Sequence, residues 1–450
     1  MSSAEREIKL AVAEEFTLPP LTDPGGDVFA GPPETLELSA RYFDTEDLRL
    51  SRVGASLRHR DDGWTVKLPR DPEEDDGVFA REELSVPGPA GPAASPPERA
   101  LDLVRALTRA SAVEQVAELR TTRRRVQLRT SEGRDVAEVV DDRVEVLDPG
   151  SSDVRQRFRE LEVELRDGAT DAHRSVVLAR LRGAGAGPPD PTPKIVRALG
   201  PAATAPPDVV VPTLEHGASV DLVVRRAIAS SVERLLRNDP GVRMGDDPEA
   251  VHQARVATRR LRSDLRTFGA LVDEQWADSL RDDLRWLGDV LGAVRDADVL
   301  IDRIERKDER LPDTDRHAGK ALVDQLRADR DRARTQLLRA LRSDRYDTLL
   351  DRLVAAAQRP RLLLRVDDVD DADVLRQLVR RPWDRLRDAV AELAPEPSDA
   401  QLHKVRIAAK RARYAAEAVE PAVGKRARVL ARALVDVQDA LGEHQDAVVA

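Results

Sequence analysis

Residues 160–165 read Glu-Leu-Glu-Val-Glu-Leu, a strict alternation of carboxylates and apolar side chains. In an extended chain, successive side chains point to opposite faces, so three carboxylates share one face here and three apolar groups share the other. Residues 5–10, Glu-Arg-Glu-Ile-Lys-Leu, place Glu5, Glu7 and Lys9 on one face in the same way. Both stretches predict β-strands that have one fully charged face.

The same alternation recurs in short segments of residues 1–200, with turn formers such as Asp61-Asp62-Gly63 between them. The charged residues at alternate positions of these segments are Arg58 and Arg60, Lys67, Arg81 and Glu83, and Arg123 and Arg125. A solvated face of an antiparallel sheet is the simpler interpretation, but such faces usually mix in Ser, Thr and Asn. Repeated full charges of both signs favour an antiparallel barrel with a charged interior. Apolar packing and two helical stretches, about 97–110 and 171–182, would cover its outside.

A charged interior restricts the chemistry of the first 200 residues, because isolated buried charges are very costly. Clustered carboxylates need a divalent cation, and all-oxygen ligation suits Mg²⁺ or Mn²⁺. Guanidinium and ammonium groups need an anion, and the fork of an arginine matches phosphate oxygens. A metal ion bound together with a polyvalent phosphate satisfies both sets, so the pattern indicates phosphoryl-transfer chemistry.

Composition excludes several other classes of function. The 450 residues, with a net charge of -10, contain no Cys, which excludes disulfides, thiol catalysis and Cys-ligated metal sites. Four Trp, three Tyr and six Phe are too few for a base-stacking nucleic-acid platform. The N-terminus shows no apolar signal region, and no stretch approaches ~20 apolar residues. We therefore expect a soluble cytoplasmic protein with neither a membrane partner nor a specific nucleic-acid partner.

From about residue 219 the pattern is helical to the end, with Leu, Val and Ala at a spacing of three to four residues. The proline-rich stretch 201–214 predicts a linker, which divides the chain into domains 1–200 and 215–450. The length and the breaks of the second domain fit a bundle of about eight helices. The chain is thus expected to be an α+β protein of two domains.

The helical half contains an internal repeat. Residues 251–265 (VHQARVATRRLRSDL) align with residues 402–416 (LHKVRIAAKRARYAA) at an offset of 151. Residues 291–297 (LGAVRDA) align with residues 441–447 (LGEHQDA) at an offset of 150. On helices, the first copy carries a basic stripe of His252, Arg255, Arg259, Arg260, Arg262 and Arg266, and the second carries His403, Arg406, Lys410, Arg411 and Arg413.

Like charges at helical spacing destabilise a helix modestly, so two copies of the stripe indicate an anionic ligand that offsets the cost. An arginine-rich solvated face with capping histidines is the alternative. Asp296, in the second repeated motif, is a candidate partner of the stripe with a purely structural role. Metal ligation by His252 and His403 is disfavoured, because their neighbours are cations rather than carboxylates.

Glu5-x-Glu7-x-Lys9 resembles the ExExK signature of the CYTH, or triphosphate tunnel metalloenzyme, superfamily. Supporting motifs follow in the family's order over residues 3–200, at Arg41–Thr45, Leu57–Arg60, Trp64–Lys67, Arg81–Glu83, Asp141 and Glu160–Leu165. The resemblance implies an eight-stranded antiparallel barrel that forms a tunnel. It also implies hydrolysis of tripolyphosphate, thiamine triphosphate or RNA 5′-triphosphates, although some members of the family cyclise ATP.

The resemblance assigns roles position by position. The implied metal ligands are Glu5, Glu7, Glu162 and Glu164, with Asp141 as a further acidic contributor. The implied triphosphate-binding and catalytic side chains are Lys9, Arg58, Arg60, Lys67, Arg81, Glu83, Arg123, Arg125 and Lys194. Two positions depart from the family pattern, since Ser85 stands where many members have an acid and Thr121 where many have Lys.

The repeated basic stripe resembles the CHAD domain, a histidine-containing α-helical domain often fused to CYTH, over residues 215–450. That family builds two similar four-helix halves and binds inorganic polyphosphate along a basic surface. Together the resemblances imply an inorganic triphosphatase dependent on Mg²⁺ or Mn²⁺, whose helical domain binds polyphosphate in the cytoplasm and at polyphosphate granules. Two alternatives stay open: a non-catalytic polyphosphate-binding protein that is targeted to granules, and a class IV-type adenylate cyclase.

Overall fold

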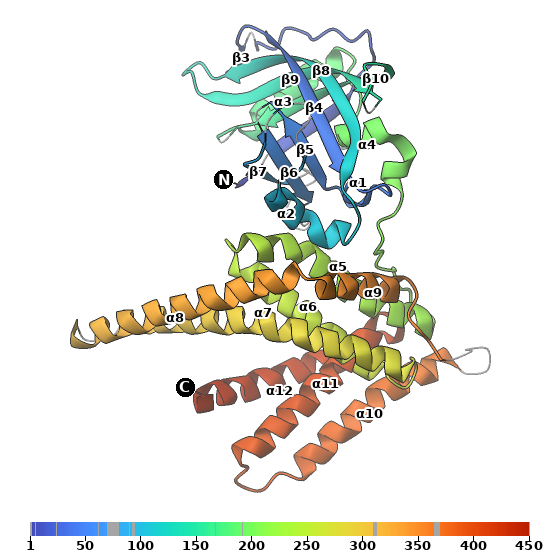
Figure 1. The fold of residues 1–450 in the computed structure, drawn as a ribbon, viewed down its shortest axis with the longest axis vertical. Helices are drawn as coiled ribbons and strands as arrows, with labels where there is room; N and C mark the ends of the chain where they lie inside the picture. The colour runs from blue at the N-terminus through green and yellow to red at the C-terminus, as the bar shows by residue number, and fades with distance from the viewer. Residues whose placement is uncertain are drawn as a thin grey trace. The chain divides into compact units, whose positions relative to one another are not determined.

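The computed structural model describes residues 2–4, 6–23, 25–61, 63–69, 81–89, 91, 95–148, 150–166, 168–190, 192–308, 313–363 and 370–449. The side chains of residues 2–4, 6, 81, 307–308, 313–318 and 443–449 lie outside this description. The chain divides into two compact units, Met1–Pro207 and Asp208–Ala450 (Figure 1). The division falls inside the stretch for which the sequence predicts a linker.

The first unit contains one antiparallel sheet that curls into a barrel. Its strands are β1 (Ser2–Ala4), β2 (Arg6–Ala11), β3 (Phe29–Ala30), β4 (Glu34–Asp44), β5 (Ser56–Arg60), β6 (Gly63–Pro69), β7 (Arg81–Val86), β8 (Glu114–Arg129), β9 (Asp135–Leu147) and β10 (Val154–Leu165). Hydrogen bonds connect them in the order β1-β7-β6-β5-β4-β8-β9-β10-β2, and β3 pairs with β8. Because β1 and β2 are consecutive parts of the N-terminal segment, they join the two ends of this path. With β1 and β2 taken as one segment and β3 set aside, the predicted eight-stranded barrel is confirmed.

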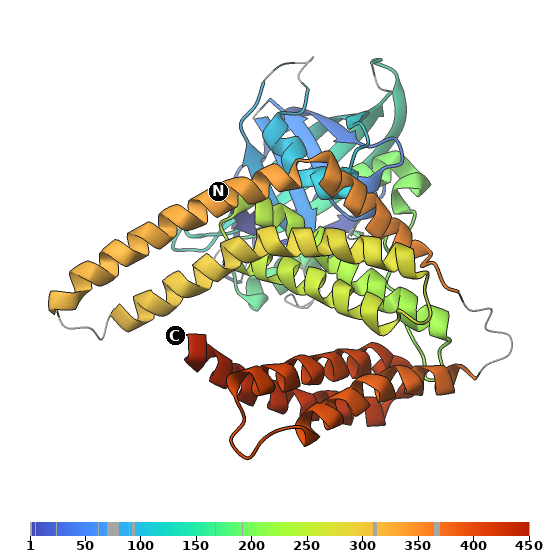
Figure 2. The ribbon, with the colours of Figure 1, turned by 60° about the horizontal axis from the view of Figure 1, so that its bottom comes forward.

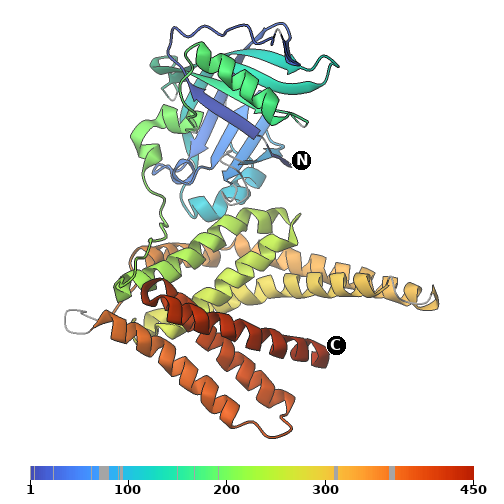
Figure 3. The ribbon, with the colours of Figure 1, turned by 180° about the vertical axis from the view of Figure 1, so that it is seen from behind.

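Strand alternation separates a charged inside of the barrel from an apolar outside. On the outer face, helix α3 (Asp171–Gly183) lies against the sheet (Figure 3). Leu161 of β10 is fully buried there and packs in one cluster with Leu181 of α3. On the inner face, the register sets Glu162 of β10 opposite Lys9 of β2. Burial of the apolar outer face stabilises the barrel, which leaves the inner face for charged side chains.

Short helices close the turns of the barrel unit: α1 (Arg49–Arg52), α2 (Glu98–Thr108), α4 (Lys194–Leu199) and the 3₁₀ helix η2 (Gly200–Thr204). Asp44 builds the turn before α1, because its carboxylate accepts hydrogen bonds from the backbone N–H of Thr45 (2.7 Å), Leu50 (2.9 Å) and Ser51 (2.9 Å). This motif aspartate therefore has a structural role. Ala203 of η2 is buried in the same cluster as α4, so the start of the predicted linker packs with the barrel.

The described part of the second unit holds eight α-helices (Figure 2). They are α5 (Val220–Met244), α6 (Pro248–Thr267), α7 (Glu274–Asp308), α8 (Asp313–Leu341), α9 (Asp344–Gln358), α10 (Asp371–Ala391), α11 (Asp399–Val423) and α12 (Lys425–Val449). The repeated motifs lie on α6 and α7 and again on α11 and α12. The two basic stripes lie on α6 and α11, which contact each other. No described helix combines the length and the hydropathy that a membrane crossing needs.

A buried polar network fixes α5 against α8 and α9. Arg243 of α5 is fully buried, and its Nε lies 2.5 Å from Asp239 Oδ1. The hydroxyl of Tyr346 on α9 donates to the other oxygen of Asp239 at 2.7 Å, and Arg243 donates to the carbonyl of Leu341 at 3.0 Å. Every buried charge in this network is therefore paired.

Candidate functional site

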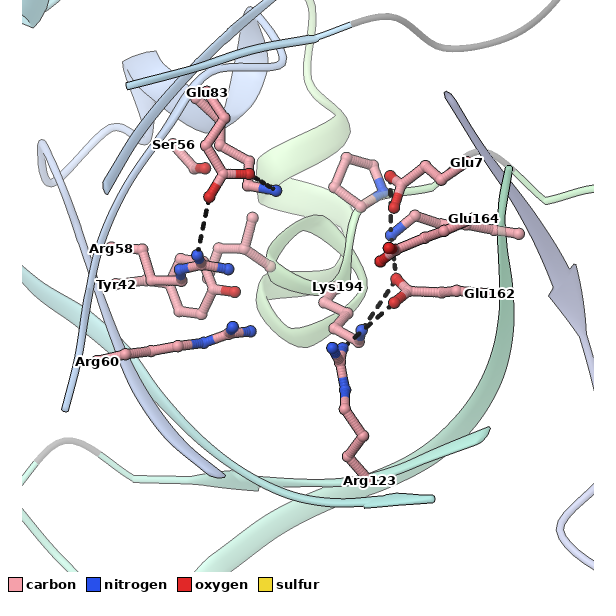
Figure 4. A pocket seen from close by; sticks show the side chains of 14 residues that line it. Glu7, Tyr42, Ser56, Arg58, Arg60, Glu83, Arg123, Glu162, Glu164 and Lys194 are labelled. Atoms are coloured by element: carbon pink, nitrogen blue, oxygen red, sulfur yellow. Dashed lines mark hydrogen bonds and ion pairs between the residues drawn. The ribbon is translucent and has the colours of Figure 1, made fainter. Parts of the chain in front are cut away.

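A cavity of about 180 Å³ lies inside the barrel and is lined mainly by charged side chains (Figure 4). Its cations are Lys9, Arg58, Arg60, Lys67, Arg123 and Lys194, and its carboxylates are Glu7, Glu83, Glu162 and Glu164. Tyr42, Ser56, Pro193 and Ile195 complete the lining. Six cations against four carboxylates give this lining a positive excess, which suits a compact polyanion.

Glu162 is the most strongly engaged carboxylate of the cavity. Its Oε1 lies 2.7 Å from Lys9 Nζ and 2.9 Å from Lys194 Nζ, and its Oε2 lies 3.3 Å from Arg123 Nη2. Burial alone would raise the pKa of Glu162, but Lys194, Lys9 and Arg123 hold that pKa well below its usual range. Burial likewise opposes the charged form of both lysines, and Glu162 nevertheless raises the pKa of each. All four groups are therefore charged near neutral pH.

Two further carboxylates lie behind Lys194. Its Nζ is 2.5 Å from Asp142 Oδ2 and 3.1 Å from Glu160 Oε1. Arg123 donates two hydrogen bonds to Asp142, at 2.9 and 2.8 Å. Burial raises the pKa of Glu160 in spite of Lys194 and Lys9. Sequence reasoning missed Asp142, whose signal is its place opposite Arg123 and Glu160 in the strand register.

Arg58, Arg60 and Tyr42 lie across the cavity from this cluster (Figure 4). Arg58 and Lys67 share one carboxylate, since Arg58 Nη2 is 3.3 Å and Lys67 Nζ is 2.6 Å from Glu83. Burial alone would raise the pKa of the Tyr42 phenol, but the cations, led by Arg58 and Arg60, lower it. Tyr42 belongs to the Arg41–Thr45 motif, and its position opposite Arg58 in the sheet brings it to the cavity.

Glu7 and Glu164 are the carboxylates that best fit a metal ion. They occupy opposite positions of β2 and β10, and Figure 4 shows them on the same side of the cavity. Among the described residues, no group of three or more Asp, Glu, His or Cys side chains is arranged to hold a metal, and Glu5 lies outside those residues. Because Mg²⁺ is usually held by one or two carboxylates plus substrate phosphates, this donor pair fits a cation that protein and phosphate bind jointly.

Two other predicted residues, Asp141 and Arg125, are not brought into the cavity. Asp141 was expected to be a metal ligand, but Arg159 donates to both of its oxygens, at 2.8 and 2.7 Å, among buried residues of the outer face. Adjacent strand residues point to opposite faces, so Asp142 lies inside instead. Arg125 pairs with the exposed Glu34 at 2.8 Å. Arg81 lies in β7, and its side chain lies outside the described residues.

The two predicted stripes of the helical unit converge on one area. We call it the α6–α11 basic surface, comprising Arg255, Arg259, Arg262, Arg266, Arg406, Lys410, Arg411 and Arg413. Burial lowers the pKa of Lys410 to about 8, helped by Arg259 of α6 and by Arg406. Burial and Arg411 of α11 lower the pKa of Arg266. Cations of both helices are therefore close enough to repel one another, as expected for a site that an anion completes.

Arg260 makes contacts that link α6 to α11. Its Nε lies 3.0 Å from Asp264 Oδ1, its Nη2 donates to the carbonyl of Tyr414 at 3.2 Å, and it pairs with Glu417. Arg413 also reaches Glu417, at 3.3 Å. Arg260 thus links α6 to α11, and it also lines a pocket together with Arg259 and Arg413, so its role in polyphosphate binding stays a prediction. Sequence spacing does not reveal this link, because it depends on how the helices cross.

The remaining stripe residues lie on the expected helices. Arg255 pairs with Asp296 at 2.5 Å, which confirms the structural partner suggested by the repeat. His252 is half-buried on α6, and His403 is exposed on α11. Sequence reasoning missed the cations of α7, because Arg285 belongs to neither repeat motif. Arg285 nevertheless lies near the stripe, since burial and this arginine lower the pKa of Arg262.

Comparisons with known proteins agree with this two-part arrangement. Residues 3–180 match the family model of the CYTH domain, and residues 226–450 match that of the CHAD domain. The chain is 35% identical over 471 residues to the uncharacterized protein Rv2226 of Mycobacterium tuberculosis, and the match covers 99% of this chain and 87% of that protein. Two solved structures are similar to part of it. The match to PptA from Streptomyces chartreusis (28% identity, TM-score 0.43) covers 51% of this chain and 83% of the PptA chain. The match to the CHAD domain from the plant Ricinus communis (30% identity, TM-score 0.44) covers 54% of this chain and 80% of that domain's chain.

Proposed function

This chain belongs to the CYTH and CHAD families, and we propose that its barrel hydrolyses inorganic triphosphate, or a related triphosphate, with a divalent metal ion. We propose further that its helical unit binds inorganic polyphosphate. The observation that carries the first proposal is the barrel cavity, in which six cations and four carboxylates share about 180 Å³. A metal–triphosphate complex supplies charges of both signs to such a cavity.

The residues of the chain divide the work of binding. Arg58 and Lys67 on one wall and Arg123 on the other bind the phosphoryl oxygens and hold the phosphate chain across the cavity. Glu7 and Glu164 would hold the divalent cation, which would supply neutralisation of phosphate charge and polarisation of the phosphoryl group. Because these groups are fixed before substrate arrives, they stabilise the charge that develops in the transition state at little cost of reorganisation.

Lys9 and Lys194 act differently, because their ammonium groups lie 2.7 and 2.9 Å from Glu162, closer than Arg123 at 3.3 Å. They keep Glu162 ionised and compensate its negative charge, so that this carboxylate does not repel the substrate. An arriving phosphate then meets a wall whose carboxylates are either paired or engaged with the metal ion.

A panel of phosphate-release assays tests the enzymatic proposal. The purified full chain is incubated with tripolyphosphate, long-chain polyphosphate, ATP or thiamine triphosphate, each with Mg²⁺, with Mn²⁺ or with EDTA. We expect metal-dependent release of phosphate, fastest with tripolyphosphate. A metal-loaded, folded chain that releases phosphate from none of the four would refute it.

Binding without turnover is the second candidate. Ser85 supports it, because this residue stands opposite Thr65 in the β6–β7 register where many family members have an acid. Tight tripolyphosphate binding with no phosphate release under any metal condition would favour this candidate. Formation of cyclic AMP in the ATP arm of the panel would instead point to a cyclase.

The convergence of α6 and α11 cations supports polyphosphate binding by the helical unit. The paired variant Arg259→Gln/Lys410→Gln removes one cation from each stripe and should weaken binding of long-chain polyphosphate, measured by titration of the full chain. Phosphate release in the barrel should be unchanged. We propose that the same surface brings the protein to polyphosphate granules, which imaging of the tagged chain and this variant can test.

A further inference from the structure

The basic surface of the helical unit extends beyond the two repeated stripes. Helices α6 and α7 are consecutive and pack against each other. Two contacts set their register: Arg255 Nη1 lies 3.5 Å from the carbonyl oxygen of Gly292, and a β-carbon at Gly288 would lie 3.7 Å from Thr258 Oγ1. From the first contact to the second, the residue number rises on α6 and falls on α7. The two helices therefore run antiparallel.

The same register places further arginines side by side. Continuing it by one turn sets Arg262 of α6 level with Arg285 of α7, and the next turn sets Arg266 level with Arg281. The pKa shifts agree with this register. After burial, Arg285 is the largest cause that lowers the pKa of Arg262. For Arg266, the largest causes after burial are Arg411 and then Arg281. Four arginines thus lie on adjacent turns of two helices, where Asp289 and Asp282 of α7 also act on Arg262 and partly offset the repulsion.

Among the described residues, the carboxylates paired with the α7 arginines belong to the same helix. Arg285 Nη1 lies 2.9 Å from Asp282, and Arg281 pairs with Asp278, each within one turn of α7 and on the outside of the protein. Exposed pairs of this kind contribute little to stability, so a polyanion can take over the guanidinium groups. The second repeat has no such pair, because residues 431 and 435 of α12, at the offset of 150, are Ala and Val.

We propose that Arg281 and Arg285 of α7 form an additional binding wall for inorganic polyphosphate, beside the α6–α11 basic surface, and that this wall selects long chains over short ones. The proposal rests on polyphosphate binding by the helical unit. The stripe from Arg255 to Arg266 runs about 16 Å along the axis of α6, at about 1.5 Å per residue. Three linked phosphoryl groups are shorter than that, so a triphosphate contacts only part of the stripe at one time, whereas a long chain contacts the stripe and the α7 wall together.

The test compares two variants of equal charge change in the full chain. Arg281→Gln/Arg285→Gln removes the wall, and Arg327→Gln/Arg332→Gln removes two exposed arginines of α8 as the matched control. Titrations with long-chain polyphosphate and with tripolyphosphate are run at several salt concentrations, and circular dichroism checks folding. We expect the wall variant alone to bind long chains about tenfold more weakly. Its dependence of log K on log salt should be shallower by about 1.4, at about 0.7 per lost phosphate contact. Tripolyphosphate binding and phosphate release should not change.

The outcomes separate this inference from the function on which it rests. If the unmodified chain does not bind long-chain polyphosphate, the proposed function of the helical unit fails. If it binds but the wall variant behaves like the control, the α7 wall is refuted. Arg281→Lys/Arg285→Lys should keep most of the affinity, and a loss as large as that of the Gln variant would contradict a mainly electrostatic role. Equal affinity for an RNA of similar length would overturn the assignment to polyphosphate.

Discussion

Replacement of Lys194 by Met should lower the free energy of unfolding of the barrel by more than the loss of an exposed charge does. The ammonium group of Lys194 lies 2.5 Å from Asp142, 2.9 Å from Glu162 and 3.1 Å from Glu160. Met keeps most of the side-chain volume but leaves three buried carboxylates short of one cation. Loss of one partner from a buried ion pair costs about 3–5 kcal/mol. With a urea dependence of about 2–3 kcal/mol per M, the unfolding midpoint should fall by about 1–2.5 M.

The stability lost in Lys194→Met should also depend on pH. Glu162 has a lowered pKa in the folded chain, so its contribution to stability is present above the pKa of the unfolded chain and is lost as pH falls through the folded value. Lys194 is the leading cation behind that lowering. The stability difference between Lys194→Met and the unmodified chain should therefore shrink as pH falls from 7 toward the acid limb.

Fluorescence of Trp64 reports the barrel alone, because this side chain is buried in the first unit and the other three tryptophans, Trp276, Trp286 and Trp383, belong to the second. The assay is urea unfolding in a background with those three replaced by Phe. Arg125→Met is the control, since its partner Glu34 is exposed and such a pair is worth under about 1 kcal/mol. A Lys194→Met midpoint that falls no further than that of the control would refute the buried cluster.

Three other predictions follow from specific contacts. Polyphosphate binding by the helical unit should weaken as pH rises through about 8, because Lys410 is protonated below that pKa and neutral above it; titrations from pH 6.5 to 9 check this, and Lys410→Arg should flatten the profile. Asp239→Ala should lower the stability of the helical unit by about 3–5 kcal/mol, because fully buried Arg243 loses its carboxylate, as urea unfolding followed by circular dichroism can measure. Asp141→Asn should destabilise the barrel through its lost charge on Arg159 and leave the metal concentration needed for half-maximal phosphate release unchanged; a large shift in that concentration would return Asp141 to the metal site.

The charged alternation was enough to predict a barrel with a charged interior, because period-two patterning records which face of each strand is buried. It was not enough to choose between Asp141 and Asp142, since a shift of one residue exchanges the two faces of a strand. Only the register of β9 against β8 and β10 places Asp142 opposite Arg123 and Glu160.

The helical half shows the same limit in another form. The repeat predicted that α6 and α11 carry matching stripes, and their side chains do lie close enough to interact. Arg260 shares the motif spacing but lies in the packing between the helices. Arg281 and Arg285 lie outside the repeat, and only the register of α7 against α6 brings them to Arg262 and Arg266.

Phosphate release from tripolyphosphate by Glu7→Gln, compared with the unmodified chain at saturating Mg²⁺, tests the metal–triphosphate cavity most directly. Gln keeps the size of Glu7 but removes the charge that faces the cavity beside Glu164, so release should fall by about a hundredfold or more. Glu145→Gln is the control, since Glu145 pairs with the exposed Arg157 at 3.0 Å and does not line the cavity, and it should retain full activity. Equal activity of Glu7→Gln and Glu145→Gln would contradict a catalytic cavity in this barrel.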